Sequence, residues 1–170
     1  MKVLALAFAL VVLSAGLARA AAPVTDAVTP PPIAFFGFHL INSSLEPTKP
    51  AEEQRIRGLD DLFRDKVGAA KGFRLIAIPP DMTAAIDRGP WIGDCNGCER
   101  DYAGKLGAGW AAWGTVQKVS NLILNINLYM EDVASGKMEF VKSVDIRGNT
   151  DESWRHGLDY MLRHYLFGEP

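Results

Sequence analysis

The chain has 170 residues, of which 18 are basic and 20 acidic, so its formal net charge at pH 7 is −2. This small negative charge excludes the electrostatic attraction that nucleic-acid-binding proteins and proteins of anionic membrane surfaces depend on. The length suits one domain with its own core and is too short for two domains of ordinary size.

Residues 1–20 have the pattern of a secretory signal peptide. Lys2 gives a basic start, residues 3–13 form an apolar run, and Ala18 and Ala20 stand in an A-x-A arrangement. The run is shorter than the roughly 20 apolar residues of a transmembrane helix. We therefore predict cleavage after Ala20, a periplasmic or secreted location, and no integral membrane segment in the mature chain.

The rest of the chain divides into a leader and a domain. Residues 21–32 are rich in proline and small side chains, which is typical of a flexible leader. A single α+β domain is expected over residues 33–167.

The first half of this domain alternates strands and helices. Residues 33–40 are apolar and aromatic, which predicts a buried strand. Pro50 and apolar residues at spacings of three and four then predict an amphipathic helix over 50–69. A second strand is expected at 73–79, followed by a short helix that Asp81 caps. The order strand, helix, strand favours a parallel pair.

The second half predicts an antiparallel meander of strands at 110–117, 121–132 and 137–146. In the middle strand, apolar residues alternate with amides and Tyr129, so one face is apolar and the other mostly polar. A final helix, with Asn149 and Glu152 as a capping box, is expected to cover the apolar face. The fold class is thus α+β, a mixed sheet of about five strands with helices packed on one face.

The two cysteines, Cys95 and Cys98, form a C-x-x-C pair at the start of a predicted helix. Glu99 occupies the position where c-type haem attachment needs histidine, and a second closely spaced pair of zinc ligands is missing, so neither cofactor nor metal is predicted. A helix start favours a thiolate, but Asp94, Glu99 and Asp101 oppose it. We favour a structural disulfide in an oxidising compartment and keep a redox-active pair as the alternative.

No motif identifies an enzyme, and we predict no catalytic residue. The chain lacks a G-x-S-x-G nucleophile elbow, an H-E-x-x-H zinc motif and a phosphate-binding glycine loop. The polar face of the meander and the turn 147–154 remain as candidate binding surfaces, because amides and aromatics recur in recognition surfaces. An ordinary solvated sheet face is the alternative. The candidate binding residues are Gln117, Lys118, Asn121, Asn125, Asn127, Tyr129, Arg147, Asn149, Asp151 and Trp154.

Three stretches carry a resemblance to a known family: "CNGCERDYAGKLG", "GAGWAAWGTVQKVSNLILNINLYMEDVASGK" and "SVDIRGNTDESWRHGLDYML". They resemble a family of bacterial predicted secreted proteins of unknown function (domain-of-unknown-function families 2380 and 3280). More distantly, the series of elements is similar to the amino-terminal domain of TolB. That resemblance implies an α+β domain that binds partner proteins, and it implies no catalytic residue.

Three hypotheses on function follow. The leading one is a periplasmic, non-enzymatic binding or envelope assembly-accessory domain that contacts an unidentified envelope protein. The second is a thiol–disulfide oxidoreductase with Cys95 as nucleophile and Cys98 as resolving thiol. The third is small-ligand or metal binding at the loop 89–98, which contains Trp91 and Asp94.

Overall fold

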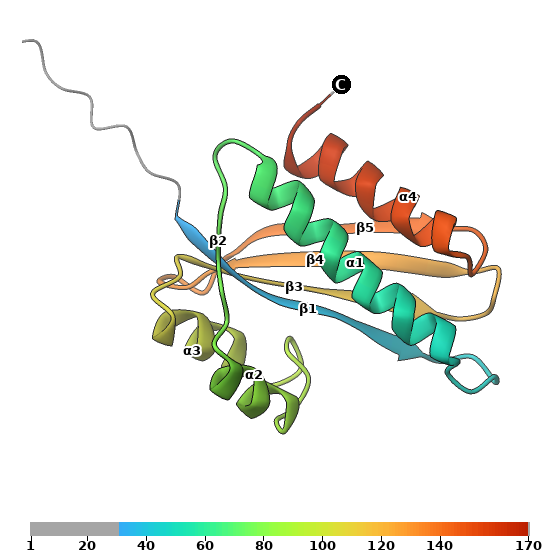
Figure 1. Cartoon of the computed structure of the whole chain (residues 1–170), viewed down its shortest axis with the longest axis horizontal. Helices are drawn as coiled ribbons and strands as arrows, with labels where there is room; N and C mark the ends of the chain where they lie inside the picture. Colours follow the sequence, from blue (N-terminus) through green and yellow to red (C-terminus); the bar gives the residue numbers. More distant parts are fainter. Residues whose placement is uncertain (1–30, 170) are drawn as a thin grey trace, which may run out of the picture.

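The computed structural model describes residues 31–169, so the predicted signal peptide and nearly all of the leader lie outside the described residues (Figure 1). Among the described residues, no helix combines the length and the apolar character that a membrane crossing requires. The elements in chain order are β1 (Pro32–Asn42), α1 (Pro50–Ala69), β2 (Arg74–Ile76), α2 (Pro80–Asp87), α3 (Cys98–Lys105), β3 (Trp110–Lys118), β4 (Leu124–Asp132), β5 (Met138–Ile146), α4 (Asp151–Met161) and a π-helical turn η1 (Leu162–Leu166).

One mixed sheet organises the domain, and the predicted α+β class is confirmed. Its strand order is β2-β1-β3-β4-β5. β1 runs parallel to both β2 and β3, whereas β3, β4 and β5 form the antiparallel meander. The parallel pairs need long connections, and these carry the helices α1, α2 and α3.

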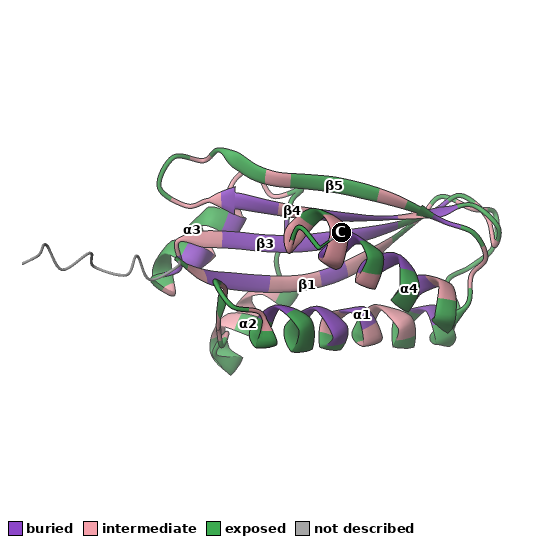
Figure 2. Cartoon of the chain, turned by 90° about the horizontal axis from the view of Figure 1, so that it is seen from above, coloured by how far each residue is buried: buried purple, intermediate pink, exposed green. Residues whose placement is uncertain are grey.

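The two long helices, α1 and α4, cover one face of the sheet (Figure 1). Leu59, Phe63 and Val67 recur on one side of α1 and are fully buried, as the helical spacing predicts. The Phe63 ring stacks on Phe35 of β1 with centroids 3.9 Å apart. We call this side of the sheet the core face, and Figure 2 shows the buried residues of α1 and α4 turned toward it.

Within residues 31–169, the opposite side of the sheet, which we call the open face, is covered only near one end, by α2, α3 and the loop between them (Figure 1). There, Ala34 of β1 and Ala111 of β3 pack with Ala103 of α3 and Ile92 of the loop. Alanines at these positions allow a helix to approach the strands closely. The open faces of β4 and β5 extend beyond this cover, and most residues of β5 are exposed (Figure 2).

Strand β1 contains a bulge between Phe35 and Phe38, where its register with β3 shifts. Gly37 adopts a φ of +89° at this point, a conformation that favours glycine. The Phe38 N–H turns away from β3 and donates to Asp60 Oδ1 of α1 at 2.7 Å. A carboxylate of α1 therefore satisfies the backbone donor that the bulge leaves unpaired.

At two helices, α2 and α4, the N-cap residue is not the one that the sequence predicts. Pro79 is the N-cap of α2 and Pro80 its first residue, so Asp81 lies inside the first turn and does not cap it. β2 covers only Arg74–Ile76 and is shorter than predicted; Pro79, the last residue of the predicted strand, cannot donate to a strand ladder. In α4 the N-cap is Thr150, whose Oγ1 accepts from Ser153 N at 3.2 Å, whereas the predicted cap Asn149 precedes it.

Candidate functional site

The structure separates the ten candidate binding residues into two groups. Strand alternation sends neighbouring side chains to opposite sides, so Gln117 lies on the open face and Lys118 on the core face. The first group lies on the open face and consists of Gln117, Asn125, Asn127 and Tyr129. The second group lies on the core face or in the loops next to it and consists of Lys118, Asn121, Arg147, Asn149, Asp151 and Trp154.

The second group gathers where three loops meet, at residues 43–49, 119–123 and 147–150, and we call this region the loop end. At its centre, Lys118 Nζ donates to Glu52 Oε1 at 2.7 Å, and both side chains are 0% exposed. The Lys49 backbone N–H donates to Glu52 Oε2 at 2.8 Å. Burial raises the pKa of Glu52, but the hydrogen bonds from Lys118, Lys49 and Asn149 outweigh it and hold that pKa below its usual value.

Asn149 links the remaining members of the loop end. Its amide nitrogen donates to Glu52 and to Asn121 Oδ1, and its oxygen accepts from Trp154 Nε1 at 3.1 Å. Arg55 of α1 donates to the same oxygen at 3.0 Å. Asn149 is therefore a hub between α1, α4 and the β3–β4 loop, which explains why it does not cap α4.

Two members of this group are not available at the surface, because Lys118 and Trp154 are fully buried. Arg147 and Asp151 are exposed, and Asp151 pairs with Arg55 at 2.6 Å. No sequence pattern identifies Glu52, which lies 66 residues before Lys118. In the sequence, Glu52 is recognisable only as an acidic side chain in the first turn of α1, where acidic side chains are common.

An exposed apolar patch lies on the outside of the loop end, and we call it the apolar tip. Asn121 Nδ2 donates to both carboxylate oxygens of Glu46, at 2.9 and 3.0 Å, which joins the β3–β4 loop to the β1–α1 loop. Ser43 N also donates to Lys118 O at 2.9 Å. The side chains of the tip are exposed and come from both loops: Leu45, Val119, Leu122 and Ile123.

A hollow of about 700 Å³ lies on the open face. Its floor includes Trp113 and Tyr129, opposite each other on β3 and β4, with ring centroids 5.4 Å apart and nearly parallel planes. The next pair along the strands is Thr115 and Asn127, which share a hydrogen bond of 3.0 Å. Residues lining the hollow are His39, Leu40, Ile41, Trp91, Ile92, Gly93, Asp94, Trp113, Thr115, Gln117, Tyr129 and Met138.

The loop between α2 and α3 forms the wall of this hollow. Trp91 is 61% exposed, and its ring lies 4.5 Å from the ring of His39 on β1. Ile92, in contrast, is buried in the small cluster under α3. Gly93 has a φ of +88° and packs on Trp113, and a Cβ there would fall 2.3 Å from the indole nitrogen. Burial lowers the pKa of His39, with Asp94 acting against it.

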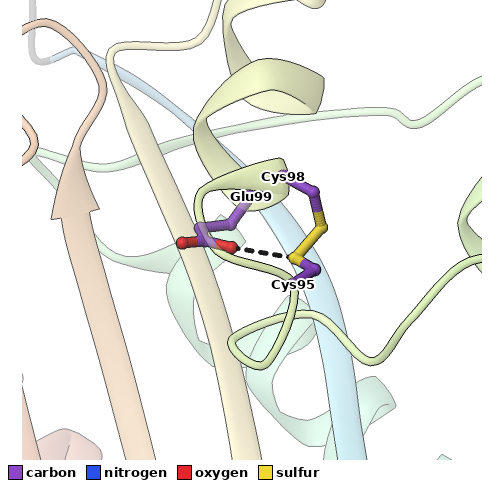
Figure 3. Close-up of a disulfide and its surroundings, with 3 residues drawn as sticks. All are labelled: Cys95, Cys98 and Glu99. Atoms are coloured by element: carbon purple, nitrogen blue, oxygen red, sulfur yellow. Dashed lines mark hydrogen bonds between the residues drawn. A yellow bond between two sulfur atoms is a disulfide. The ribbon is translucent and has the colours of Figure 1, made fainter.

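The loop ends at the Cys95–Cys98 disulfide, whose Cα atoms are 5.5 Å apart, so the predicted pairing is present (Figure 3). Cys98 is the first residue of α3. The Glu99 carboxylate, which is 8% exposed, lies 3.1 Å from Cys95 Sγ. A neighbouring carboxylate opposes the thiolate that a reactive cysteine needs. Ligand atoms of these three residues lie within 4.8 Å of one another, but a disulfide offers a metal no thiolate.

A second acidic side chain, Glu131, lies near Glu99. Burial raises the pKa of Glu131, the charge of Glu99 raises it further, and Arg100 acts against both. Arg100 Nε lies 3.4 Å from Glu131 Oε1. Glu99, which lies beside the disulfide, therefore has both a second carboxylate and a cation in its neighbourhood.

Solved structures with a similar arrangement of elements include the LpoB C-terminal domain from Salmonella enterica, with 13% identity, a TM-score of 0.47, and coverage of 72% of this chain and 87% of that one. TolB from Acinetobacter baumannii has 11% identity and a TM-score of 0.46, with coverage of 83% and 29%. The PelC dodecamer from Paraburkholderia phytofirmans has 11% identity and a TM-score of 0.47, with coverage of 79% and 86%. Similarity of this size does not indicate function.

None of the curated proteins matches the chain in sequence. The family model DUF3280, described as "Protein of unknown function (DUF2380)", matches residues 31–166. This match covers nearly all of the described domain and confirms the family resemblance carried by the three stretches quoted above. The chain belongs to this family of proteins of unknown function.

Proposed function

We propose that this chain is a non-enzymatic binding domain that contacts a partner protein through the apolar tip. The observation that carries the proposal is the exposure of Leu45, Val119, Leu122 and Ile123 on two loops that are joined to each other. Leu122 alone is 72% exposed. Several exposed aliphatic side chains on neighbouring loops are typical of protein interaction sites.

The loop end supports the tip from inside. Asn121 is bonded to Glu46 on one side and to Asn149 on the other, so the two loops are tied to each other and to the start of α4. A surface that is already ordered loses less conformational entropy when a partner binds. We assign Asn121 and Asn149 this supporting role, while the aliphatic side chains make the contact.

The location of the partner rests on the predicted signal peptide. A chain exported by that peptide meets envelope and periplasmic proteins, so the proposed partner is one of these. In this proposal the chain acts as an assembly accessory. It binds its partner and uses no catalytic group.

The test is capture of partners from an envelope extract on the immobilised mature chain, with the double variant Leu122→Ser, Ile123→Ser beside the wild type. The variant removes two aliphatic side chains that the proposed partner would bury in the complex, so binding is expected to weaken by about tenfold or more. The matched control is Val141→Ser on β5, an aliphatic side chain that is also exposed but lies far from the tip. Captured proteins are quantified by mass spectrometry.

Because all three replaced side chains are exposed, the variants are expected to fold like the wild type. The proposal requires that proteins captured by the wild type and by Val141→Ser are depleted with the double variant. Equal capture by all three chains would show that the tip is not the contact surface.

A further inference from the structure

We propose that the hollow on the open face is a binding site for a short neutral saccharide. This proposal concerns a different surface from the apolar tip and does not depend on it. The volume of about 700 Å³ is within the range of roughly 300 to 1,000 Å³ that is usual for ligand sites. The identity of the ligand follows from the side chains that line it.

The exposed indole of Trp91 suits the apolar face of a sugar ring. A pyranose ring has an apolar C–H face and a rim of hydroxyls, so it packs on a flat aromatic surface while its rim makes hydrogen bonds. Trp91 presents such a surface, being 61% exposed while its ring lies against His39. Leaving so large an apolar side chain in water forfeits the stabilisation that its burial would give.

The exposure of Trp91 is not the result of a loose loop. Ile92, the next residue, is buried, and Asp94 N donates to Trp91 O at 2.9 Å in a tight turn. The disulfide then fixes the loop to α3. The chain therefore holds the indole in place at the rim of the hollow, which lowers the entropy cost of binding.

The hollow also contains hydrogen-bonding groups that suit sugar hydroxyls. Within residues 31–169, the Gln117 amide makes no hydrogen bond to the protein and is exposed. Thr115 Oγ1 accepts from Asn127, which leaves its O–H free to donate. Asp94 adds carboxylate acceptors. An amide, a hydroxyl and a carboxylate match the mixed donors and acceptors of sugar hydroxyls.

The charge of the hollow and the geometry of its aromatic rings favour a neutral ligand. Among the described residues that line the hollow, Asp94 is the one acidic side chain, and it disfavours phosphates and other anions. A quaternary ammonium would need several ring faces around it. The rings of Trp113 and Tyr129 instead lie face to face with an interplanar angle of 18°, so they cover each other.

The experiment is isothermal titration calorimetry on the mature chain with chitotriose, maltotriose and cellotriose as probes and tetramethylammonium chloride for comparison. The variants are Trp91→Ala and Gln117→Ala, both at exposed positions, so neither is expected to disturb the core. Tyr165→Ala is the matched control, since it removes an exposed aromatic ring that does not line the hollow. Thermal unfolding of each variant checks the fold.

The expected result is binding of at least one trisaccharide to the wild type, about tenfold weaker in Trp91→Ala and severalfold weaker in Gln117→Ala. Tyr165→Ala and the tip variant Leu122→Ser, Ile123→Ser are expected to bind as the wild type does, so this proposal and the proposed function fail separately. Absence of binding by all three sugars, equal affinity of Trp91→Ala and wild type, or binding of tetramethylammonium alone would overturn the proposal.

Discussion

The loop end and the open face are both rich in polar side chains, yet they use them in opposite ways. At the loop end, the charges and amides are bonded to one another beneath α1 and α4, as in the pair of Lys118 with Glu52. On the open face, the hydrogen-bonding capacity of Gln117 and Thr115 stays turned toward the hollow. Saturated polar groups stabilise a fold, whereas unsaturated ones at a surface are free to bind a ligand.

This difference arises between adjacent residues of one strand. Gln117 and Lys118 alternate to the two sides of β3. At this end of the strand the described helices meet only its core side, because α3 packs on the open side near Ala111, at the other end. There α1 supplies Glu52, while above Gln117 the sheet is uncovered. An amide-rich segment can thus serve stability through one set of residues and recognition through the other, and polarity alone does not distinguish them.

The sharpest test of this contrast replaces the two neighbours separately. Lys118→Met leaves the buried Glu52 carboxylate without its cation and is expected to lower the free energy of unfolding by about 3–5 kcal/mol. Gln117→Ala removes an exposed amide and is expected to change it by less than about 0.5 kcal/mol. Urea denaturation monitored by circular dichroism measures both.

The double variant Glu52→Gln, Lys118→Met separates loss of the pair from loss of packing. With the charge removed from both positions, part of the stability lost in Lys118→Met should return, because no unpaired buried charge remains. If Lys118→Met were no less stable than Gln117→Ala, the loop end would not be the stabilising region we describe.

A second test asks whether the disulfide stabilises the open side or carries out chemistry. Cys95→Ala, Cys98→Ala is expected to lose about 2 kcal/mol, the chain-entropy value for so short a loop. The wild type unfolded in the presence of a thiol reductant is the control and should lose a similar amount. Unchanged stability in both cases would show that the bond does not constrain the domain.

The reduction potential of the same bond distinguishes a structural disulfide from the oxidoreductase alternative. We expect a value below about −300 mV, because the Glu99 carboxylate beside Cys95 disfavours the thiolate. A value between about −270 and −120 mV would instead support an oxidoreductase. Titration against glutathione buffers, read out by alkylation of free thiols, gives this potential.

Local patterns in the sequence were sufficient for the elements but not for the sites. The spacing of Leu59, Phe63 and Val67 predicts α1, and the alternation in β4 predicts which of its faces is buried, because both depend on neighbours in the chain. The pairing of Glu52 with Lys118 joins positions 66 residues apart, and no local periodicity carries that information. The Cys95–Cys98 disulfide, in contrast, could be predicted because its two cysteines are three positions apart in the sequence.

The hollow was harder still to foresee. Trp91 and Asp94 stand out in the loop sequence, but the other residues that line the hollow with them come from other elements. His39 lies on β1 and Trp113 on β3, and the parallel pairing of these strands brings both beside the loop. Asn149 shows the reverse case, since a local capping pattern was overridden by bonds to Glu52, Asn121 and Trp154.

The smallest expected effect compares two carboxylates of α1. Glu52 has a cation and a lowered pKa, whereas burial raises the pKa of Asp60 to about 6, against the Phe38 N–H and the charge of Arg64. A carboxyl whose pKa is higher folded than unfolded, here about 6 against 3.8, binds more protons in the folded state, so its contribution to stability falls as pH rises between these values. Above that window the charged Asp60 destabilises the fold.

Asp60→Asn keeps an oxygen to accept from Phe38 N but carries no charge, so it should stabilise the protein by about 1–2 kcal/mol near pH 7.5 and have almost no effect near pH 4. Asp65→Asn, at an exposed position further along α1 whose charge does not contribute to the raised pKa of Asp60, is the control and should change stability little at either pH. Urea denaturation across this pH range measures the difference. A stabilisation of equal size at every pH would mean that packing, and not the buried charge, distinguishes Asp60 from Glu52.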